Sequence, residues 1–326
     1  MKAGSLTLDR GDALRRNTLE AILLVAASSL AFALMGACVK GSTASVPFLV
    51  AVFFRSVVGM LPLLAYFAWK RRPVRAVQHL LLFVRSLFGF TAMCMFFLAI
   101  EALPLSTAVI LNFSSPIFVV ILSGLFLHER TAAVVLPMVA VAFGGVALLV
   151  SPDFSTSKVE AILGLASAFF AAMAYVTIKR LSRTESPTTI VLFFSIYSSL
   201  FSVVAVALAG ATGLIDLCGD GVIAMLANPR ELALLLGVGI AGTAGQVLLT
   251  AAYSRERASI VSPFQYLSPV FSYVIGLLLF DEVPTIASIG GGLMVMAASV
   301  GVLLVSREKT HPVAVEPVAQ EVSSGE

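Results

Sequence analysis

Long apolar stretches alternate with short polar segments along most of the chain. Each stretch holds about 20 residues, the length that a helix needs to cross a hydrocarbon core of roughly 30 Å. The stretches are continuous rather than alternating, so they favour helices over the strands of a membrane barrel. We therefore predict an all-α polytopic membrane protein with ten transmembrane helices. The predicted spans are 20–40, 48–69, 78–99, 103–127, 132–150, 160–180, 190–210, 231–252, 259–280 and 286–306.

The chain contains two related halves. "NFSSPIFVVILSGLFLHE" at 112–129 recurs as "QYLSPVFSYVIGLLLFDE" at 265–282, an offset of 265 − 112 = 153 residues. A second pair supports the repeat: "EAILLVAASSLAFALMGACVK" from Glu20 resembles "EAILGLASAFFAAMAYVTIKR" from Glu160. Five spans are an odd number, so a second copy must enter the membrane from the opposite side. Inverted repeats of this kind are common in secondary transporters.

The predicted organisation follows from the repeat and the basic residues. We expect a cytoplasmic N-terminal tail at 1–19, five-helix repeats at 20–150 and 156–306, and a disordered cytoplasmic tail at 307–326. Of the 21 Lys and Arg residues, 16 lie on the N-terminal side, three on the opposite side and two inside spans. Because inner loops carry the excess of positive charge, both termini are predicted to be cytoplasmic.

The composition excludes several classes of protein. Hydrophobic residues make up 59% of the chain and charged residues 12%, whereas a soluble domain has about 25% charged residues. Three scattered cysteines do not suggest a disulfide or zinc framework, and basic inner loops explain the net charge without nucleic acid. The sequence has no HExxH, GxSxG or phosphate-binding glycine loop, and no filter-like loop. We expect no enzymatic activity, no cofactor and no metal; a membrane-embedded enzyme or scaffold and a channel are the rival classes.

Two arginines fall inside predicted spans. Arg55 lies in the second span and Arg85 in the third. An arginine near the bilayer centre costs about 2.5 to 3.5 kcal/mol, so it normally faces a partner or a water-filled cavity. We expect both to bind an anionic substrate group such as a carboxylate; the alternative is that they reach the headgroups or bond helix-end carbonyls. They align with Ser195 and Val238, so the second half lacks these charges.

Polar and aromatic residues in the other spans form a second group of candidates. Such side chains can line a cavity for a partly apolar organic molecule, or they can join helices to one another. The candidates are Asn112, Tyr175, Tyr197, Gln246, Gln265 and Tyr266.

The repeat also places prolines and glycines at matching positions. Asn112 and Gln265 lie one helical turn before Pro116 and Pro269, and these prolines are predicted to kink the fourth and ninth helices. Gly89 aligns with Gly242, where close packing or bending during transport is expected.

Three segments resemble a known family. "FFRSVVGMLPLL", "VRSLFGFTAMCMFFLAIEALPLSTAVILNFSSPIFVVILSGLFLHER" and "SIVSPFQYLSPVFSYVIGLLLFDEVPT" look like the EamA-domain carriers of the drug/metabolite transporter superfamily. The resemblance covers about 20–306 and is nearest to the branch with S-adenosylmethionine uptake and organic-anion carriers. It implies two inverted five-helix bundles, alternating access around a central cavity, and a bacterial inner membrane. Uptake carriers of that branch often have a basic residue where this chain has Gln265.

We therefore expect a multi-pass secondary transporter of a small organic metabolite with a carboxylate. The alternatives are an exporter of amino acids or toxic amphipathic compounds and an S-adenosylmethionine-type uptake carrier. The expected partners are the small-molecule substrate and the lipid bilayer. A coupling or exchanged ion or metabolite, the direction of transport, and a monomeric or homodimeric state stay open. No Asp or Glu lies deep in a span, which favours facilitated diffusion, exchange or coupling near the span ends.

Overall fold

A computed structural model describes residues 2–41, 48–71, 74–102, 111–129, 134–150, 158–211, 227–280 and 285–308. Every regular element in these ranges is helical. The predicted tail from 309 onward and residues 103–110 of the fourth predicted span lie outside them. The helices are α1 (Lys2–Gly41), α2 (Phe48–Trp69), α3 (His79–Ala102), α5 (Ser115–Phe126), α6 (Val135–Val150), α7 (Lys158–Leu181), α8 (Pro187–Ala211), α10 (Pro229–Arg255), α11 (Ala258–Val261), the 3₁₀ helix η1 (Ser262–Tyr266), α12 (Leu267–Phe280) and α13 (Ile286–Glu308).

The predicted apolar stretches become helices of two lengths. Seven segments within the described residues are long and apolar enough to cross a membrane. Three further apolar helices are shorter, at Ser115–Phe126, Val135–Leu148 and Ile289–Val302. Helix α1 begins at Lys2, well before the predicted start of the first span, although its apolar part begins only at Arg16. The first span therefore continues as a helix into the polar N-terminal segment.

Helix starts follow local sequence signals. Pro187 and Pro229 occupy the first positions of α8 and α10, where the missing N–H of proline has no helical partner to lose. The side chain of Asn228 caps α10 by accepting a hydrogen bond from the backbone N–H of Arg230 at 3.0 Å. These signals place the ends of the long helices on either side of the cavity described below.

The repeated prolines lie at helix starts, which corrects the predicted kinks inside continuous helices. Residues 113 and 114 form a turn, and Pro116 belongs to the first turn of α5. Pro269 lies in the first turn of α12, directly after the 3₁₀ helix η1. Proline is tolerated in a first turn. Regular α-helix is interrupted just before each proline. Asn112 and Gln265 lie at these interruptions, on the N-terminal side of the prolines.

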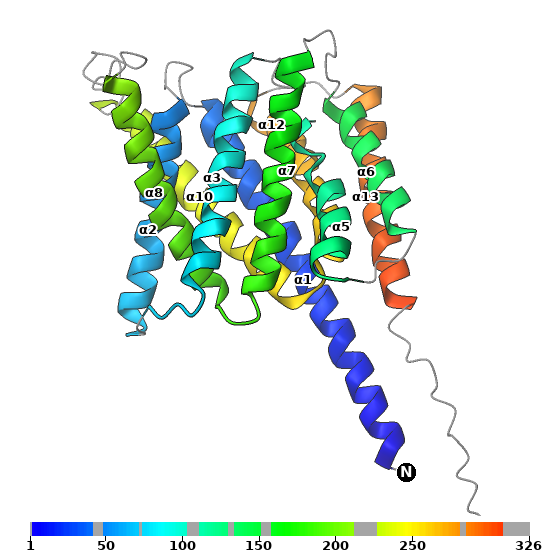
Figure 1. Cartoon of the computed structure of the whole chain (residues 1–326). Helices are drawn as coiled ribbons and strands as arrows, with labels where there is room; N and C mark the ends of the chain where they lie inside the picture. The colour runs from blue at the N-terminus through cyan, green and yellow to red at the C-terminus, as the bar shows by residue number, and fades with distance from the viewer. Residues whose placement is uncertain are drawn as a thin grey trace, which may run out of the picture.

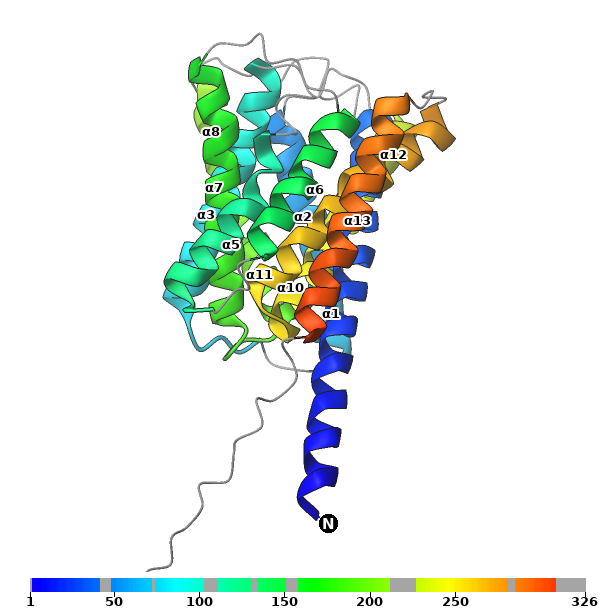
Figure 2. The ribbon, with the colours of Figure 1, turned by 90° about the vertical axis from the view of Figure 1, so that its right-hand side faces the viewer.

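The two halves of the chain pack against each other reciprocally. Helix α1 packs against α10, and α7 packs in the same way against α3, so the first helix of each half contacts the third helix of the other. The pairs α2–α8 and α6–α13 also join corresponding helices. Figures 1 and 2 show α6 and α13 side by side at one edge of the bundle. In Figure 1, α1 leads away from the N-terminal end of the molecule and α7 leads back toward it.

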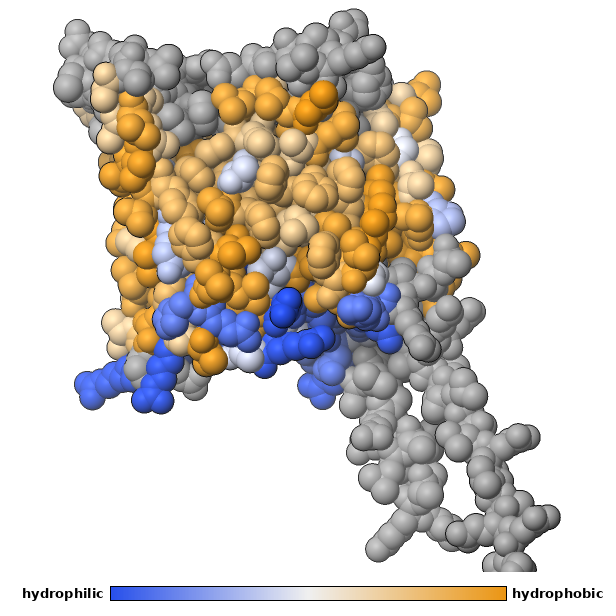
Figure 3. Space-filling model, in the orientation of Figure 1, coloured by the Kyte–Doolittle hydropathy of each residue, from blue (hydrophilic) through white to orange (hydrophobic). Residues whose placement is uncertain are grey.

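The surface is apolar around the middle of the bundle. Figure 3 shows a hydrophobic belt, with hydrophilic residues gathered at the end from which the N-terminal helix extends. Leu80, Leu125 and Leu278 are all more than 60% exposed, which suits side chains that face lipid rather than water. A large part of the described chain is therefore built to be surrounded by hydrocarbon.

Candidate functional site

A central cavity of about 350 Å³ lies between the two halves, within the usual range of roughly 300–1,000 Å³ for small-molecule sites. Its walls come from α1, α2, α3, α5, α7, α8, α10, η1 and α12. Apolar side chains such as Phe32, Phe96 and Leu249 form much of the lining. Six of the eight predicted binding residues also line it: Arg55, Arg85, Asn112, Tyr175, Gln246 and Gln265.

Arg85 is the most deeply buried charged residue of the cavity. Its side chain projects from α3, and the residue is only 2% exposed. The guanidinium carbon lies 3.8 Å from the centre of the Phe194 ring on α8, which makes a cation–π contact. Among the residues that the structure describes, its Nε and Nη1 atoms have no hydrogen-bond partner. The ring stabilises the charge from one side and leaves hydrogen-bond donors unused.

Arg55 reaches the same cavity from α2. Its Nη1 donates to the Met93 sulfur at 3.2 Å, and a thioether is only a weak acceptor. Arg55 and Arg85 repel each other electrostatically, and Tyr175 lies close enough to interact with both. Among the described residues, no Asp or Glu lines the cavity or forms an ion pair with either arginine. The cavity therefore holds two positive charges without a described counter-charge.

The amide side chains are held by neighbours on other helices. Asn112 Nδ2 donates to Ser167 Oγ on α7 at 2.9 Å, and Gln265 Nε2 donates to the Tyr253 hydroxyl on α10 at 2.7 Å. The Tyr253 ring stacks on Tyr175 at 5.5 Å between centroids. These contacts fix the amides at the cavity wall, where their remaining donor and acceptor positions can orient a ligand.

Two predicted site residues lie elsewhere. Tyr197 belongs to a cluster of rings with Phe83 and Phe201, at 5.4 Å and 6.3 Å, and it is absent from the cavity lining. Tyr266 is fully buried beside Phe113, and its hydroxyl has no hydrogen-bond partner within the described ranges. Tyr266 is the last residue of the 3₁₀ helix η1, and it does not line the cavity although the neighbouring Gln265 does. The sequence could not reveal this 3₁₀ helix, because a regular helix was expected there.

Several lining residues were not predicted. Phe194 carries the ring beneath Arg85, Met93 contacts Arg55, and Ser28 donates to the Gly245 carbonyl at 2.8 Å. Phe194 had a detectable signal, because it directly precedes Ser195, the repeat counterpart of Arg55. The others look like ordinary packing residues, and only the fold brings them to the cavity.

Toward the N-terminal end of the molecule the cavity is closed by polar contacts, of which those of Glu129 join the two halves and that of Lys179 lies within the second half. The carboxylate of Glu129, just after α5, accepts hydrogen bonds from the backbone N–H groups of Ala258 and Ser259 at 3.0 and 3.2 Å. It also accepts one from the Ser259 hydroxyl at 3.0 Å. Lys179 Nζ donates to the Glu256 carbonyl at 2.7 Å, and the Thr18 hydroxyl donates to the Glu256 carboxylate.

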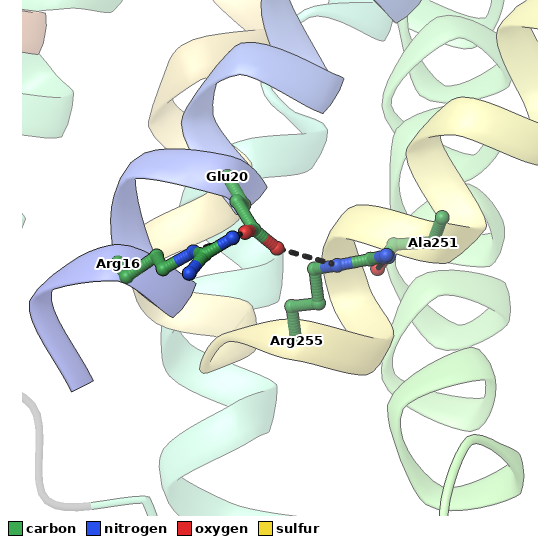
Figure 4. A network of polar contacts seen from close by, with 4 residues as sticks. All are labelled: Arg16, Glu20, Ala251 and Arg255. Carbon is green, nitrogen blue, oxygen red and sulfur yellow. Dashed lines mark hydrogen bonds and ion pairs between the residues drawn. The ribbon is translucent and has the colours of Figure 1, made fainter. Parts of the chain in front are cut away.

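A weaker contact lies at the outer edge of this closure. Figure 4 shows the Glu20 carboxylate of α1 between Arg16 and Arg255. The distances are 3.2 Å to Arg16 and 3.5 Å to Arg255, and all three side chains are at least 42% exposed. Exposed pairs of this kind contribute about 0 to 1 kcal/mol. At the other end, the cavity lining continues to Met35 and Val39, in the part of α1 farthest from the N-terminus.

The part of the chain that the structure describes contains no group of three His, Cys, Asp or Glu residues that could hold a metal ion. The chemistry of the cavity consists of cations, amides, hydroxyls and rings.

A family profile, the EamA-like transporter family, matches the sequence twice, over residues 19–151 and 158–305. The chain belongs to this family. The EamA-like chain is 36% identical to the pseudopaline exporter CntI of Pseudomonas aeruginosa over 282 residues, which covers 86% of this chain and 94% of the relative. It is 24% identical to an S-adenosylmethionine uptake transporter of Rickettsia bellii over 251 residues, covering 77% and 81%.

Other similarities are more distant. Human solute carrier family 35 member G1 is 26% identical over 237 residues, covering 69% of this chain and 62% of the relative. A solved crystal structure matches with a TM-score of 0.72 at 17% identity, over 87% of this chain and 98% of that one. At that identity the match shows a shared fold. The EamA-like chain is therefore a membrane transporter, and the predicted superfamily is confirmed.

Proposed function

We propose that this EamA-like protein is a secondary transporter that moves a small carboxylate-bearing organic metabolite across a bacterial inner membrane by alternating access. The observation that carries the proposal is the presence of Arg55 and Arg85 in one mostly apolar cavity without a described carboxylate partner. Burying an uncompensated charge costs several kcal/mol. An anionic ligand would supply both the missing charge and the missing hydrogen-bond acceptors.

The form of the cavity supports alternating access. Contacts of Glu129 and Lys179 close it at the N-terminal end, while its lining continues toward the opposite end. The reciprocal packing of the halves and the two family matches support inverted repeats, for which we keep the bounds 20–150 and 156–306. The basic residues of the N-terminal end support a cytoplasmic location for both termini.

Thermal stability of the detergent-purified protein tests the anion site. Organic anions, amino acids, nucleosides and S-adenosylmethionine are added in turn, and a ligand at 100 times its dissociation constant should add about 2.7 kcal/mol of stability. We expect carboxylates to raise the melting temperature of the wild type. Arg55→Gln should weaken binding by roughly tenfold or more, because a hydrogen bond to a charged group is worth about 1.5 to 3 kcal/mol.

Arg255→Gln is the matched control, because this arginine is exposed and does not line the cavity. It should bind the same carboxylates as the wild type. If Arg55→Gln also binds them with unchanged affinity, the anion role of Arg55 is wrong.

Export is the second candidate function, and the presence of the pseudopaline exporter among the relatives favours it. An exporter of amino acids or toxic amphipathic compounds predicts that only these compounds stabilise the protein, that the arginines are structural, and that overexpression gives resistance. An S-adenosylmethionine carrier predicts stabilisation by that compound. The same panel therefore distinguishes the three substrate classes. Comparing substrate accumulation in inside-out and right-side-out vesicles gives the direction of transport.

A further inference from the structure

The two cavity arginines lie against glycines at equivalent positions of the repeat. Gly89 on α3 and Gly242 on α10 are separated by 242 − 89 = 153 residues, the offset of the repeated segments. A Cβ atom at Gly89 would lie 3.3 Å from Arg85 Nη1 and 2.9 Å from Phe194 Cε2. A Cβ atom at Gly242 would lie 3.2 Å from Arg55 Nε and 2.8 Å from the Met35 sulfur.

The two glycines are counterparts in the repeat, but the two arginines that lie against them are not. Arg55 aligns with Ser195 and Arg85 aligns with Val238, so neither arginine is the counterpart of the other. The first half supplies both charges, yet one of them packs on a glycine of the first half and the other on the matching glycine of the second half. The absence of a side chain at each glycine leaves the space that a guanidinium group occupies.

We propose that the cavity is a two-position receptor for an organic dicarboxylate. Arg55 and Arg85 each bind one carboxylate, and Gly89 and Gly242 are positioning residues that admit the guanidinium groups to the cavity wall. The proposal rests on the proposed function of an anion carrier and narrows its substrate class. Phosphate monoesters also carry two negative charges, but on a single group, which would leave one of two separate arginines less well paired.

The lining indicates the rest of the substrate. Apart from the two arginines, much of the cavity lining is apolar, with Phe32, Phe96 and Phe113 among its side chains, and the amides of Asn112 and Gln265 also line it. A skeleton that is apolar between its two carboxylates fits such a wall, because each charged end meets a donor and the middle displaces water from apolar surface. We therefore assign an amphipathic dicarboxylate rather than a sugar or a nucleotide.

Matched acids test the two positions. Succinate, adipate and suberate are compared with butanoate, hexanoate and octanoate by ligand-induced thermal shift and by calorimetry on the full-length protein in detergent, with inorganic phosphate as a further probe. The best dicarboxylate should bind about tenfold or more tighter than its matched monocarboxylate, because its second carboxylate gains a charged hydrogen bond. In Arg55→Gln and in Arg85→Gln that advantage should disappear.

Each outcome has a distinct meaning. If dicarboxylates and monocarboxylates bind equally well, the two-position inference is wrong and the anion carrier stands. If phosphate binds best, the dicarboxylate assignment is wrong. If no carboxylate binds at millimolar concentration, the proposed function itself fails.

Glycine variants test the positioning role. Gly89→Ala and Gly242→Ala should lower dicarboxylate affinity by roughly tenfold while retaining both charges, since each new methyl group crowds one guanidinium together with the Phe194 ring or the Met35 sulfur beside it. Gly36→Ala is the matched control, because a Cβ atom there meets nothing within 4 Å. Unchanged dicarboxylate affinity in both alanine variants would overturn the positioning role. The arginine variants still decide between one and two positions if an alanine variant does not fold.

Discussion

Arg85 combines three properties at the scale of a single residue. It is charged, it is 2% exposed, and two of its nitrogens lack hydrogen-bond partners among the described residues. The Phe194 ring at 3.8 Å is its principal described contact. A cation–π contact is worth about 2 kcal/mol when the pair is removed from water. That is less than the cost of an unpaired buried charge, so the ring orients Arg85 but leaves it ready for an anion.

Phe194→Leu should therefore lower both the stability of the protein and its affinity for the ligand. We expect a loss of about 1 to 2 kcal/mol of stability and a severalfold weaker affinity for the best carboxylate, because the guanidinium loses its support. Phe201→Leu is the control, since Phe201 contacts Tyr197 and Phe90 outside the cavity lining. Calorimetric titration of both variants measures the difference. Wild-type affinity in Phe194→Leu would show that the ring does not position Arg85.

The sequence predicted the cavity residues well where their chemistry was unusual for a membrane span. Arg55 and Arg85 were found because a charge within a membrane span is costly and usually has a function. Asn112 and Gln265 were found because they occupy equivalent positions in the repeat. Tyr197 and Tyr266 were chosen on the same grounds, but a tyrosine can also complete a packed cluster. Only the rotation of each helix decides between these roles, and the weak amphipathicity of a span does not reveal that rotation.

At the scale of helices, α6 and α13 depend on one close approach. A Cβ atom at Gly145 of α6 would lie 2.7 Å from the Gly291 carbonyl oxygen and 2.9 Å from Met294 Cβ of α13. Both neighbours belong to, or are fixed by, backbone that cannot move without shifting the helix. Small residues at such crossings allow helices to pack closely in a bilayer.

Gly145→Ala should lower the stability of the purified protein by about 1 to 3 kcal/mol, the usual effect of overpacking. The adjacent Gly144→Ala is the control, because its Cβ atom would meet only Met294 Cε, at 3.9 Å. Melting temperatures in detergent should separate the two variants, and ligand affinity should be unchanged in both. Equal melting temperatures would mean that α6 and α13 can separate at little cost.

Helix ends show the limit of sequence reasoning at this scale. The long spans were predicted within a few residues, because apolar length is a strong signal. The interruptions before Pro116 and Pro269 were expected as kinks, since proline in a repeated apolar run does not say whether a helix bends or restarts. Glu129 accepts hydrogen bonds from the backbone N–H groups at the start of α11 in the other half. A contact over 129 residues has no local signature.

At the scale of the whole molecule, the halves are joined by corresponding contacts. The first helix of each half packs on the third helix of the other, and α6 packs on its counterpart α13. The sequence indicated the two related halves through its repeated segments, but not which helices of one half pack on which helices of the other. It did not indicate which end of the cavity would be closed, because both ends are built from similar segments and only the contacts of Glu129, Lys179 and Glu256 distinguish them.

The unpaired arginines also bear on how the carrier returns after releasing its cargo. An empty cavity that reorients carries two buried cations without an anion beside them, at a penalty of several kcal/mol for each ion, whereas a bound dicarboxylate compensates both charges. The loaded protein should therefore reorient faster than the empty one. Proteoliposomes preloaded with unlabelled dicarboxylate should take up labelled dicarboxylate severalfold faster than empty vesicles. Equal uptake rates would mean that the empty protein reorients as fast as the loaded one. A severalfold difference would make this protein an exchanger, in which export of one substrate molecule is coupled to import of another.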